Sequence, residues 1–165
     1  MEQFKYYAPT KILFGKNTET EVGTLCQTQG ASKVLVHFGG SSAQKSGLLD
    51  RVCKSLQAAG LHYVTLGGVV PNPRLSKVYE GIELCKRENV DFILAVGGGS
   101  VIDSAKAIGY GITNPGDVWD YYSGKAPQAC ATIGAVLTIA AAGSEMSNAS
   151  VITNEDGWLK RGLQS

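Results

Sequence analysis

Histidine is scarce in this 165-residue sequence, and its scarcity limits the chemistry that the chain can contain. The two histidines, His37 and His62, belong to no HxxxH or HExxH pattern. The four cysteines stand at positions 26, 53, 85 and 130, so there is no CxxC pair and no zinc-finger spacing. We therefore expect no metal site and no catalytic residue in this chain. We expect the four cysteines to be buried free thiols, which points to a reducing compartment.

Charged side chains are also few. They make up 18% of the sequence, with a net charge of +1, whereas about 25% is typical of soluble domains. A charge so close to zero gives no electrostatic reason to expect a nucleic acid as partner. The first residues lack the pattern of a secretory signal, and the longest weakly polar stretch, residues 129–142, is too short to span a bilayer. We expect a cytoplasmic protein that does not enter a membrane.

Hydrophobic runs and helical periodicity alternate along the chain, which predicts an α/β fold. We expect strands at residues 33–38, 62–66, 91–96 and 132–139, and helices at residues 18–28, 46–60, 75–85 and from Ser100 to about residue 108. This alternation is typical of a Rossmann-like parallel sheet with helices on both faces. The segment 6–15 is predicted as an extra strand or hairpin at the sheet edge. Residues 153–165 are polar and stop without an obvious structural ending.

Glycine is abundant, with 21 residues, and its longest run follows a predicted strand. Gly97, Gly98 and Gly99 precede Ser100, where a helix begins. Glycines permit close approach of a bulky anion, and the helix start offers free N–H groups to a pyrophosphate. The alternative is a capping box between Ser100 and Asp103 that needs no ligand. The run matches neither GxGxxG nor a P-loop.

A second glycine pair ends the first predicted strand. Gly39 and Gly40 precede Ser41 and Ser42, and no Asp or Glu occurs from Gly30 to Leu49. Dinucleotide-binding folds commonly hold the ribose 2′-hydroxyl with an acid near a strand end, and an acid would repel a 2′-phosphate. The pattern favours NADP(H) over NAD(H). The alternative is a simple tight turn between strand and helix.

Two further segments are candidates for the same site. Residues 138–145 combine small side chains with the hydroxyls of Thr138 and Ser144. They allow close approach of a cofactor ring, although a packed small-residue turn explains them equally well. Pro71, Asn72 and Pro73 form a rigid loop after the second predicted strand.

These segments together resemble the iron-containing (type III) alcohol dehydrogenase family, and in particular its NADP-using, butanol dehydrogenase-like branch. The residues that carry the resemblance are GGSS at 39–42, PNP at 71–73, GGGSxxDxAK at 97–106, and residues 138–145. The ending at 151–154 and 160–162 is similar as well. The resemblance covers essentially the whole chain.

The resemblance implies that residues 1–165 are the dinucleotide-binding domain of a dehydroquinate synthase-like superfold. It implies phosphate binding by Gly97, Gly98, Gly99 and Ser100, with Asp103, Thr138 and Ser144 near the nicotinamide. It places Gly39, Gly40 and Ser42 at the adenosine 2′-phosphate, Asn72 in the matching loop, and Lys160 at a cofactor ribose. Ala142 stands where the family commonly has Thr, which removes one hydroxyl contact.

The family binds iron or zinc through an Asp and three His on a helical domain that this chain lacks. We therefore expect the chain to supply the cofactor half of a metal-dependent alcohol dehydrogenase acting on alcohols or aldehydes. Alone, it should bind NADP(H) weakly or not at all, without turnover, and a homo-oligomer is left open. The alternatives are a piece of a glycerol dehydrogenase-like or dehydroquinate synthase-like enzyme, or a nucleotide-binding module without catalysis.

Overall fold

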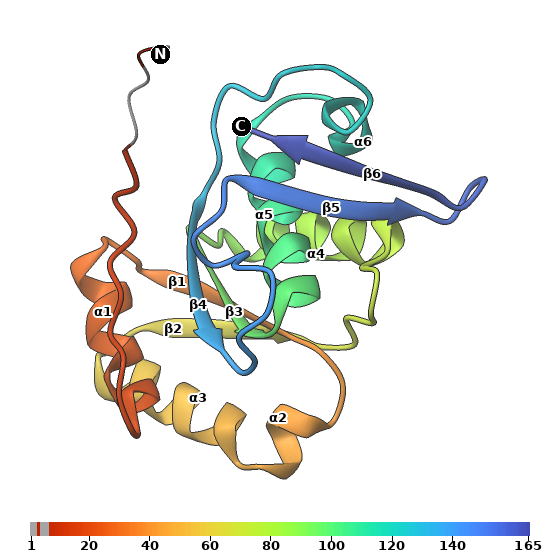
Figure 1. The fold of residues 1–165 in the computed structure, drawn as a ribbon. Coiled ribbons are helices and arrows are strands. Elements are labelled where there is room, and N and C mark those ends of the chain that lie inside the picture. The colour runs from red at the N-terminus through yellow and green to blue at the C-terminus, as the bar shows by residue number, and fades with distance from the viewer. Residues whose placement is uncertain (1–2, 4–6) are drawn as a thin grey trace.

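A four-stranded parallel sheet forms the centre of the computed structural model, which describes residues 3 and 7–165 (Figure 1). The strands lie in the order β2-β1-β3-β4. Their bounds are β1 (Lys33–Phe38), β2 (His62–Leu66), β3 (Phe92–Gly97) and β4 (Thr132–Leu137). All three pairings in this sheet are parallel, which confirms the predicted α/β fold.

Helices cover both faces of the sheet. One face carries the 3₁₀ helix η1 (Thr18–Glu21), α1 (Val22–Thr28), α2 (Ser42–Lys45) and α3 (Leu48–Ala58), and the other carries α4 (Leu75–Glu88) and α5 (Gly99–Thr113). Val34 and Val36 of β1 belong to the α1–α3 core, whereas Leu35 belongs to the α4–α5 core. Because both faces of β1 are buried, its sequence is a continuous apolar run rather than an alternating one.

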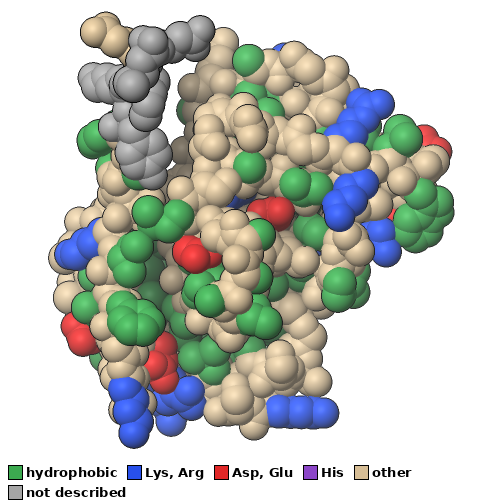
Figure 2. Space-filling model, viewed as in Figure 1, with side chains coloured by type: hydrophobic (Ala, Val, Ile, Leu, Met, Phe, Trp, Pro, Cys, Tyr) green, Lys and Arg blue, Asp and Glu red, His purple; other side chains and the backbone are tan. Residues whose placement is uncertain are grey.

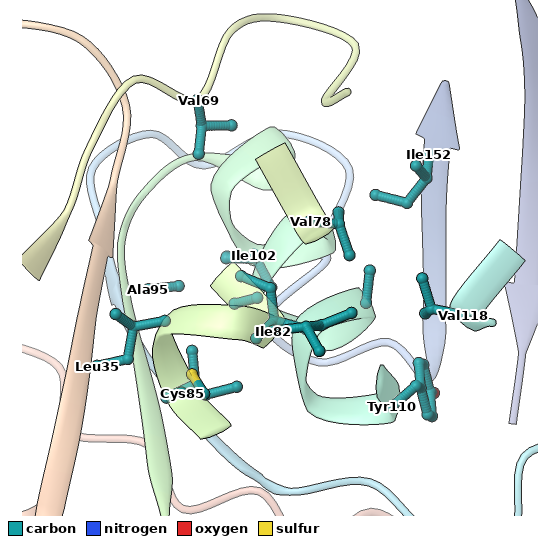
Figure 3. Close-up of a cluster of buried hydrophobic side chains, with 14 of the residues drawn as sticks. Leu35, Val69, Val78, Ile82, Cys85, Ala95, Ile102, Tyr110, Val118 and Ile152 are labelled. Carbon is teal, nitrogen blue, oxygen red and sulfur yellow. The ribbon is translucent and has the colours of Figure 1, made fainter. Parts of the chain in front are cut away.

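A hairpin forms a further layer outside α4 and α5. It consists of β5 (Ala149–Asn154) and β6 (Leu159–Gln164), which pair antiparallel. Ile152 of β5 extends the core between α4 and α5, together with Val118 of α6 (Val118–Tyr121), as Figure 3 shows. The polar residues 153–165, for which the sequence shows no structural ending, thus contain the end of β5 and all of β6. Only Leu163 of β6 is buried, so the strand has no hydrophobic alternation to reveal it.

The predicted strand or hairpin at residues 6–15 is wrong over the part that the structure describes. Tyr6 lies outside the described residues, and no strand occurs in residues 7–15. Ile12, Leu13 and Phe14 are exposed, and Phe14 is 96% exposed. An apolar run signals a strand only where a partner edge and a core receive it, and this segment has neither.

Several glycines serve helix packing rather than ligand binding. A Cβ on Gly23 of α1 would lie 2.0 Å from the Ser55 carbonyl oxygen of α3, and a Cβ on Gly111 of α5 would lie 2.1 Å from Ile82 Cδ1 of α4. The Gly23 N–H also donates a 2.9 Å hydrogen bond to the Ser55 hydroxyl. Part of the glycine excess is thus structural.

No helix in the described part of the chain is both long and apolar enough to cross a membrane.

Candidate functional site

The two glycine turns predicted to bind phosphates lie beside each other. They follow β1 and β3, which are parallel neighbours whose ends are in register at Phe38 and Val96. The chain leaves β1 toward β2 on one side and returns to β3 on the other, so the strand order reverses here. In open α/β sheets, ligands bind at such a reversal, outside the carboxyl ends of the strands.

Val101 of α5 fits between these two turns. A Cβ on Gly97 would lie 2.5 Å from Val101 Cγ2, and a Cβ on Gly39 would lie 3.7 Å from the same atom. The contact fixes the start of α5 against the end of β1. Gly40 faces open space, since a Cβ added there would have no atom within 4 Å, and Ser42 begins α2 with an exposed side chain.

Helix α5 begins without a side-chain cap. Gly98 is the N-cap residue, and Ser100 is already the second helical residue, so the capping-box alternative is wrong. Among the described residues, no hydrogen bond is formed by the backbone N–H groups of Gly98, Gly99 and Ser100. These N–H groups and the positive end of the helix dipole suit an anion such as a pyrophosphate.

The segment from Thr138 to Ser144 lies against this turn. The Thr138 N–H donates a 3.1 Å hydrogen bond to the Gly97 carbonyl. A Cβ on Gly98 would lie 2.8 Å from Ile139 Cγ2, and one on Gly99 would lie 3.2 Å from the Ser144 hydroxyl oxygen. The structure therefore brings Thr138 and Ser144 close to the glycine run.

Lys106 holds this segment in place, a role that sequence reasoning missed. Its ammonium donates hydrogen bonds to the carbonyls of Ser144, Ser147 and Ala149 at 2.7, 2.7 and 2.8 Å. Burial lowers the pKa of Lys106, while Asp103 acts to raise it. Lys106 and Asp103 are the two charged residues of α5, and a charged pair in an otherwise apolar helix was the available signal.

Asp103 points toward β5 and has one unused acceptor. Its Oδ2 accepts a 3.1 Å hydrogen bond from the Val151 N–H. Its Oδ1 is buried and has no partner within the described residues. Burial raises the pKa of this carboxyl, against lowering effects from Val151, Ser144, Lys106 and Lys160. An unpaired buried oxygen costs free energy, so it fits a site that receives a hydroxyl or amide donor from a cofactor.

Asn72 and Lys160, both predicted for the site, contact each other directly. The Lys160 ammonium donates a 2.8 Å hydrogen bond to the Asn72 side-chain oxygen. Asn72 has a φ of 56°, in the left-handed region that non-glycine residues seldom adopt. The neighbouring Pro73 carbonyl accepts a 2.9 Å hydrogen bond from the Thr153 N–H. The loop at residues 71–73 is thus fastened to the β5–β6 hairpin.

The positively charged side chain of Lys77 lies near the turn after β1. The Gly68 N–H donates a 2.9 Å hydrogen bond to the Gly39 carbonyl, which joins the ends of β1 and β2. A Cβ on Gly68 would lie 3.6 Å from the Lys77 ammonium. Lys77 itself pairs with Glu80 at 2.5 Å. Lys77 was not predicted, because its place beside Gly68 depends on how α4 packs.

His37 is a structural residue. It is fully buried on β1, with Nδ1 2.9 Å from the Leu66 carbonyl and Nε2 2.9 Å from the Ser104 hydroxyl. Nδ1–H donates to the carbonyl, so Nε2 accepts from Ser104. Burial lowers its pKa to about 4. Within residues 3 and 7–165, no group of three or more His, Cys, Asp or Glu could hold a metal ion.

The thiols lie away from this site. A surface hollow lined by Cys85, Asn89, Thr113 and Cys130 lies at the amino ends of the strands, opposite the glycine turns. All four cysteines are free of disulfides. Burial raises the pKa of Cys26 and Cys130 to about 11 and that of Cys85 to about 12. Such thiols are poor nucleophiles near neutral pH.

Comparison with known proteins shows the family to which the chain belongs. A model of the family described as iron-containing alcohol dehydrogenase matches residues 9–165. The chain belongs to this family. It is 46% identical over 166 residues to the probable NADH-dependent butanol dehydrogenase 1 of Bacillus subtilis, covering 100% of this chain and 43% of that protein. It is 34% identical over 169 residues to the NADPH-dependent aldehyde reductase YqhD of Escherichia coli, with 100% and 43% covered.

A solved structure has the same fold. The NADH-dependent butanol dehydrogenase A of Thermotoga maritima superimposes with a TM-score of 0.96 at 44% identity, covering 100% of this chain and 42% of that one. The chain therefore spans less than half the length of the relatives it matches, and it corresponds to their amino-terminal portion. The family resemblance and the Rossmann-like fold predicted from the sequence are confirmed.

Proposed function

We propose that this chain is the NAD(P)-binding portion of a metal-dependent alcohol dehydrogenase, which transfers hydride between an alcohol or aldehyde and a nicotinamide dinucleotide. The observation that carries the proposal is the start of α5. There, the free N–H groups of Gly98, Gly99 and Ser100 lie at the strand-order reversal, beside the Gly39 turn. Its relatives include proteins named butanol dehydrogenase and aldehyde reductase.

Each predicted residue has a part in this proposal. Residues 97–100 bind the pyrophosphate, and Gly39, Gly40 and Ser42 bind the adenosine end. Thr138, Ser144 and the unpaired Asp103 Oδ1 face the nicotinamide end, and Asn72 with Lys160 reaches the ribose on that side, because Lys160 lies near enough to Asp103 to act to lower the pKa of its carboxyl. The bound dinucleotide supplies the hydride chemistry, while the residues of this chain bind and orient it.

We further propose that NADP(H) is preferred over NAD(H). Relatives named for NADH and for NADPH both match the chain, so the preference rests on its own residues. No carboxylate occurs from Gly30 to Leu49, and Lys77 lies beside Gly68, which contacts the Gly39 turn. No acidic residue from that stretch therefore repels the 2′-phosphate of NADP(H).

The metal belongs to another part of the protein in this proposal. We infer that the metal ligands lie elsewhere, because no group of three or more His, Cys, Asp or Glu among the described residues could hold a metal ion. Residues 1–165 form the dinucleotide-binding domain, and a helical domain holds the metal.

Large apolar side chains that reach the surface, among them Ile139 and Trp158 at 63% and 66% exposure, suit packing against that domain or a second copy. Figure 2 shows hydrophobic side chains at the surface of one face. Four free thiols favour the cytoplasm.

A nucleotide titration tests the proposal. The N–H groups of residues 98–100, which bond no described residue, favour weak binding over none; in saturation-transfer NMR on the 165-residue chain, we therefore expect millimolar binding of NADPH, weaker binding of NADH and no alcohol oxidation. Gly40→Glu places a carboxylate in open space at the turn, so it should weaken NADPH binding more than NADH binding, while Gly40→Gln should leave the ratio unchanged. Tighter NADH binding contradicts the cofactor preference. Binding of neither nucleotide contradicts the proposed function, and turnover by this chain alone contradicts the separate metal domain.

A further inference from the structure

Glu155, in the turn between β5 and β6, accepts hydrogen bonds from the first turn of α4 with both carboxylate oxygens. Oε2 accepts a 3.1 Å hydrogen bond from the Ser76 N–H, and Oε1 accepts a 2.6 Å hydrogen bond from the Ser76 hydroxyl. Ser76 is the second residue of α4, so the carboxylate also meets the positive end of the helix. Burial acts to raise the pKa of Glu155, but the Ser76 hydrogen bonds and the Arg74 charge lower it overall.

Three more contacts join the same two segments. The Thr153 N–H bonds the Pro73 carbonyl at 2.9 Å, and the Arg74 guanidinium lies 4.5 Å from the centre of the Trp158 ring. The third is the Lys160–Asn72 hydrogen bond of 2.8 Å. Residues 72–76 are therefore fastened to residues 153–160 along their whole length.

Both segments hold a residue in an unfavourable backbone conformation. Asn72 has a φ of 56° and Trp158 a φ of 53°. Non-glycine residues persist in this region only where their surroundings determine the conformation. Asn72 and Trp158 both take part in the contacts between the two segments. Glu155 makes two of them, yet it touches none of the residues assigned to the cofactor.

We propose that Glu155 is a positioning residue for dinucleotide binding. By fixing the start of α4 to the β5–β6 turn, it sets where Asn72 and Lys160 stand in the site. This role rests on the proposed function, because it presumes that Asn72 and Lys160 contact the cofactor. It differs from a general stabilising role, since its loss moves one wall of the site and leaves the turn at residues 97–100 in place.

Two nucleotide probes distinguish these roles. Glu155→Ala should weaken NADPH binding about fivefold, because Asn72 and Lys160 are then no longer held in position for the cofactor. Binding of adenosine 2′,5′-bisphosphate, which lacks the nicotinamide half, should change less than twofold. Glu155→Gln should restore most of the affinity, because its amide oxygen still accepts from the Ser76 N–H. Asp156→Ala, in the same turn, is the matched control and should bind NADPH as the wild type does.

Hydrogen exchange gives a reading that does not depend on the nucleotide. In Glu155→Ala, the amides of Asn72 and of residues 74–76 should exchange faster, and those of α5 should not change. If that variant does not fold, Ser76→Ala removes the hydroxyl contact alone and should show the same pattern in smaller measure. Equal NADPH binding by wild type and Glu155→Ala, or equal weakening of both probes, contradicts the role of Glu155 alone. Failure of the wild type to bind NADPH contradicts the proposed function as well.

Discussion

The Lys160 ammonium donates a hydrogen bond to the Asn72 side-chain oxygen although 88 residues separate them in the chain. The bond connects β6 to the loop before α4, at the mouth of the proposed cofactor site. In the proposed site, a ribose hydroxyl would replace this bond, by accepting from the Lys160 ammonium or by donating to the Asn72 oxygen. The pair is thus an exposed polar contact and not part of the hydrophobic core.

Lys160→Ala should therefore weaken NADPH binding about tenfold, the effect of losing a hydrogen bond from a charged donor. The side chain is exposed, so the melting temperature should change little. Lys54→Ala, at an exposed position on α3, removes the same charge elsewhere and should have no effect. Equal affinity in both variants, measured by saturation-transfer NMR, contradicts the assignment of Lys160.

Lys106→Met should destabilise the segment from Ser144 to Ala149. The substitution keeps an apolar stem but leaves three carbonyls without their donor. We expect a loss of about 2 kcal/mol in the free energy of unfolding, measured with urea, and faster amide exchange in residues 144–149. Lys86→Met, on the exposed side of α4, serves as the control. An unchanged exchange pattern would show that Lys106 does not organise the segment.

Stability should fall as the pH is lowered from about 6.5 toward 4 because of His37. Burial lowers the pKa of this imidazole to about 4 from a usual value of 6.5, so the unfolded chain binds the proton first. The neutral ring contributes fully above pH 6.5, and roughly 3 kcal/mol is lost by pH 4. The difference in urea stability between wild type and His37→Gln across this range isolates the effect from the carboxylates. A parallel pH dependence in both proteins would refute it.

Gly23→Ala should reduce stability even though alanine favours helices. The added Cβ would lie 2.0 Å from the Ser55 carbonyl oxygen, and that backbone atom cannot rotate away. A loss of about 3 kcal/mol follows from forcing α1 and α3 apart. Gly40→Ala, where no atom lies within 4 Å, is the matched control and should leave the unfolding midpoint unchanged.

The sheet could be predicted from the sequence because its strands are buried on both faces. Continuous apolar runs such as residues 34–38, with helices between them in the sequence, predict a parallel sheet that is covered by helices on both faces. The predicted boundaries differ slightly from the structure: the strand expected at 132–139 ends at Leu137, and the helix expected at 46–60 is Leu48–Ala58, with α2 separate. Turn geometry at Gly47, with a φ of 69°, separates the two helices.

The parts that could not be predicted depend on contacts distant in sequence. The glycine turns were recognisable because their residue types are unusual at strand ends. The roles of Lys106 and Glu155 were not, because their partners lie 38–43 and 79 residues away. Strand β6 was missed because hydrogen bonding to β5, and not apolar burial, defines it.

The position of the β5–β6 hairpin has a consequence for the order in which the site is completed. Ribosomal synthesis proceeds from the amino terminus, and long-range pairings form late. The glycine turns after β1 and β3 can form once α5 has emerged, but the loop at residues 72–76 has no hairpin to hold it until residues 153–160 follow. A nascent chain can therefore form the proposed phosphate-binding turns before residues 153–160 complete the proposed cofactor site.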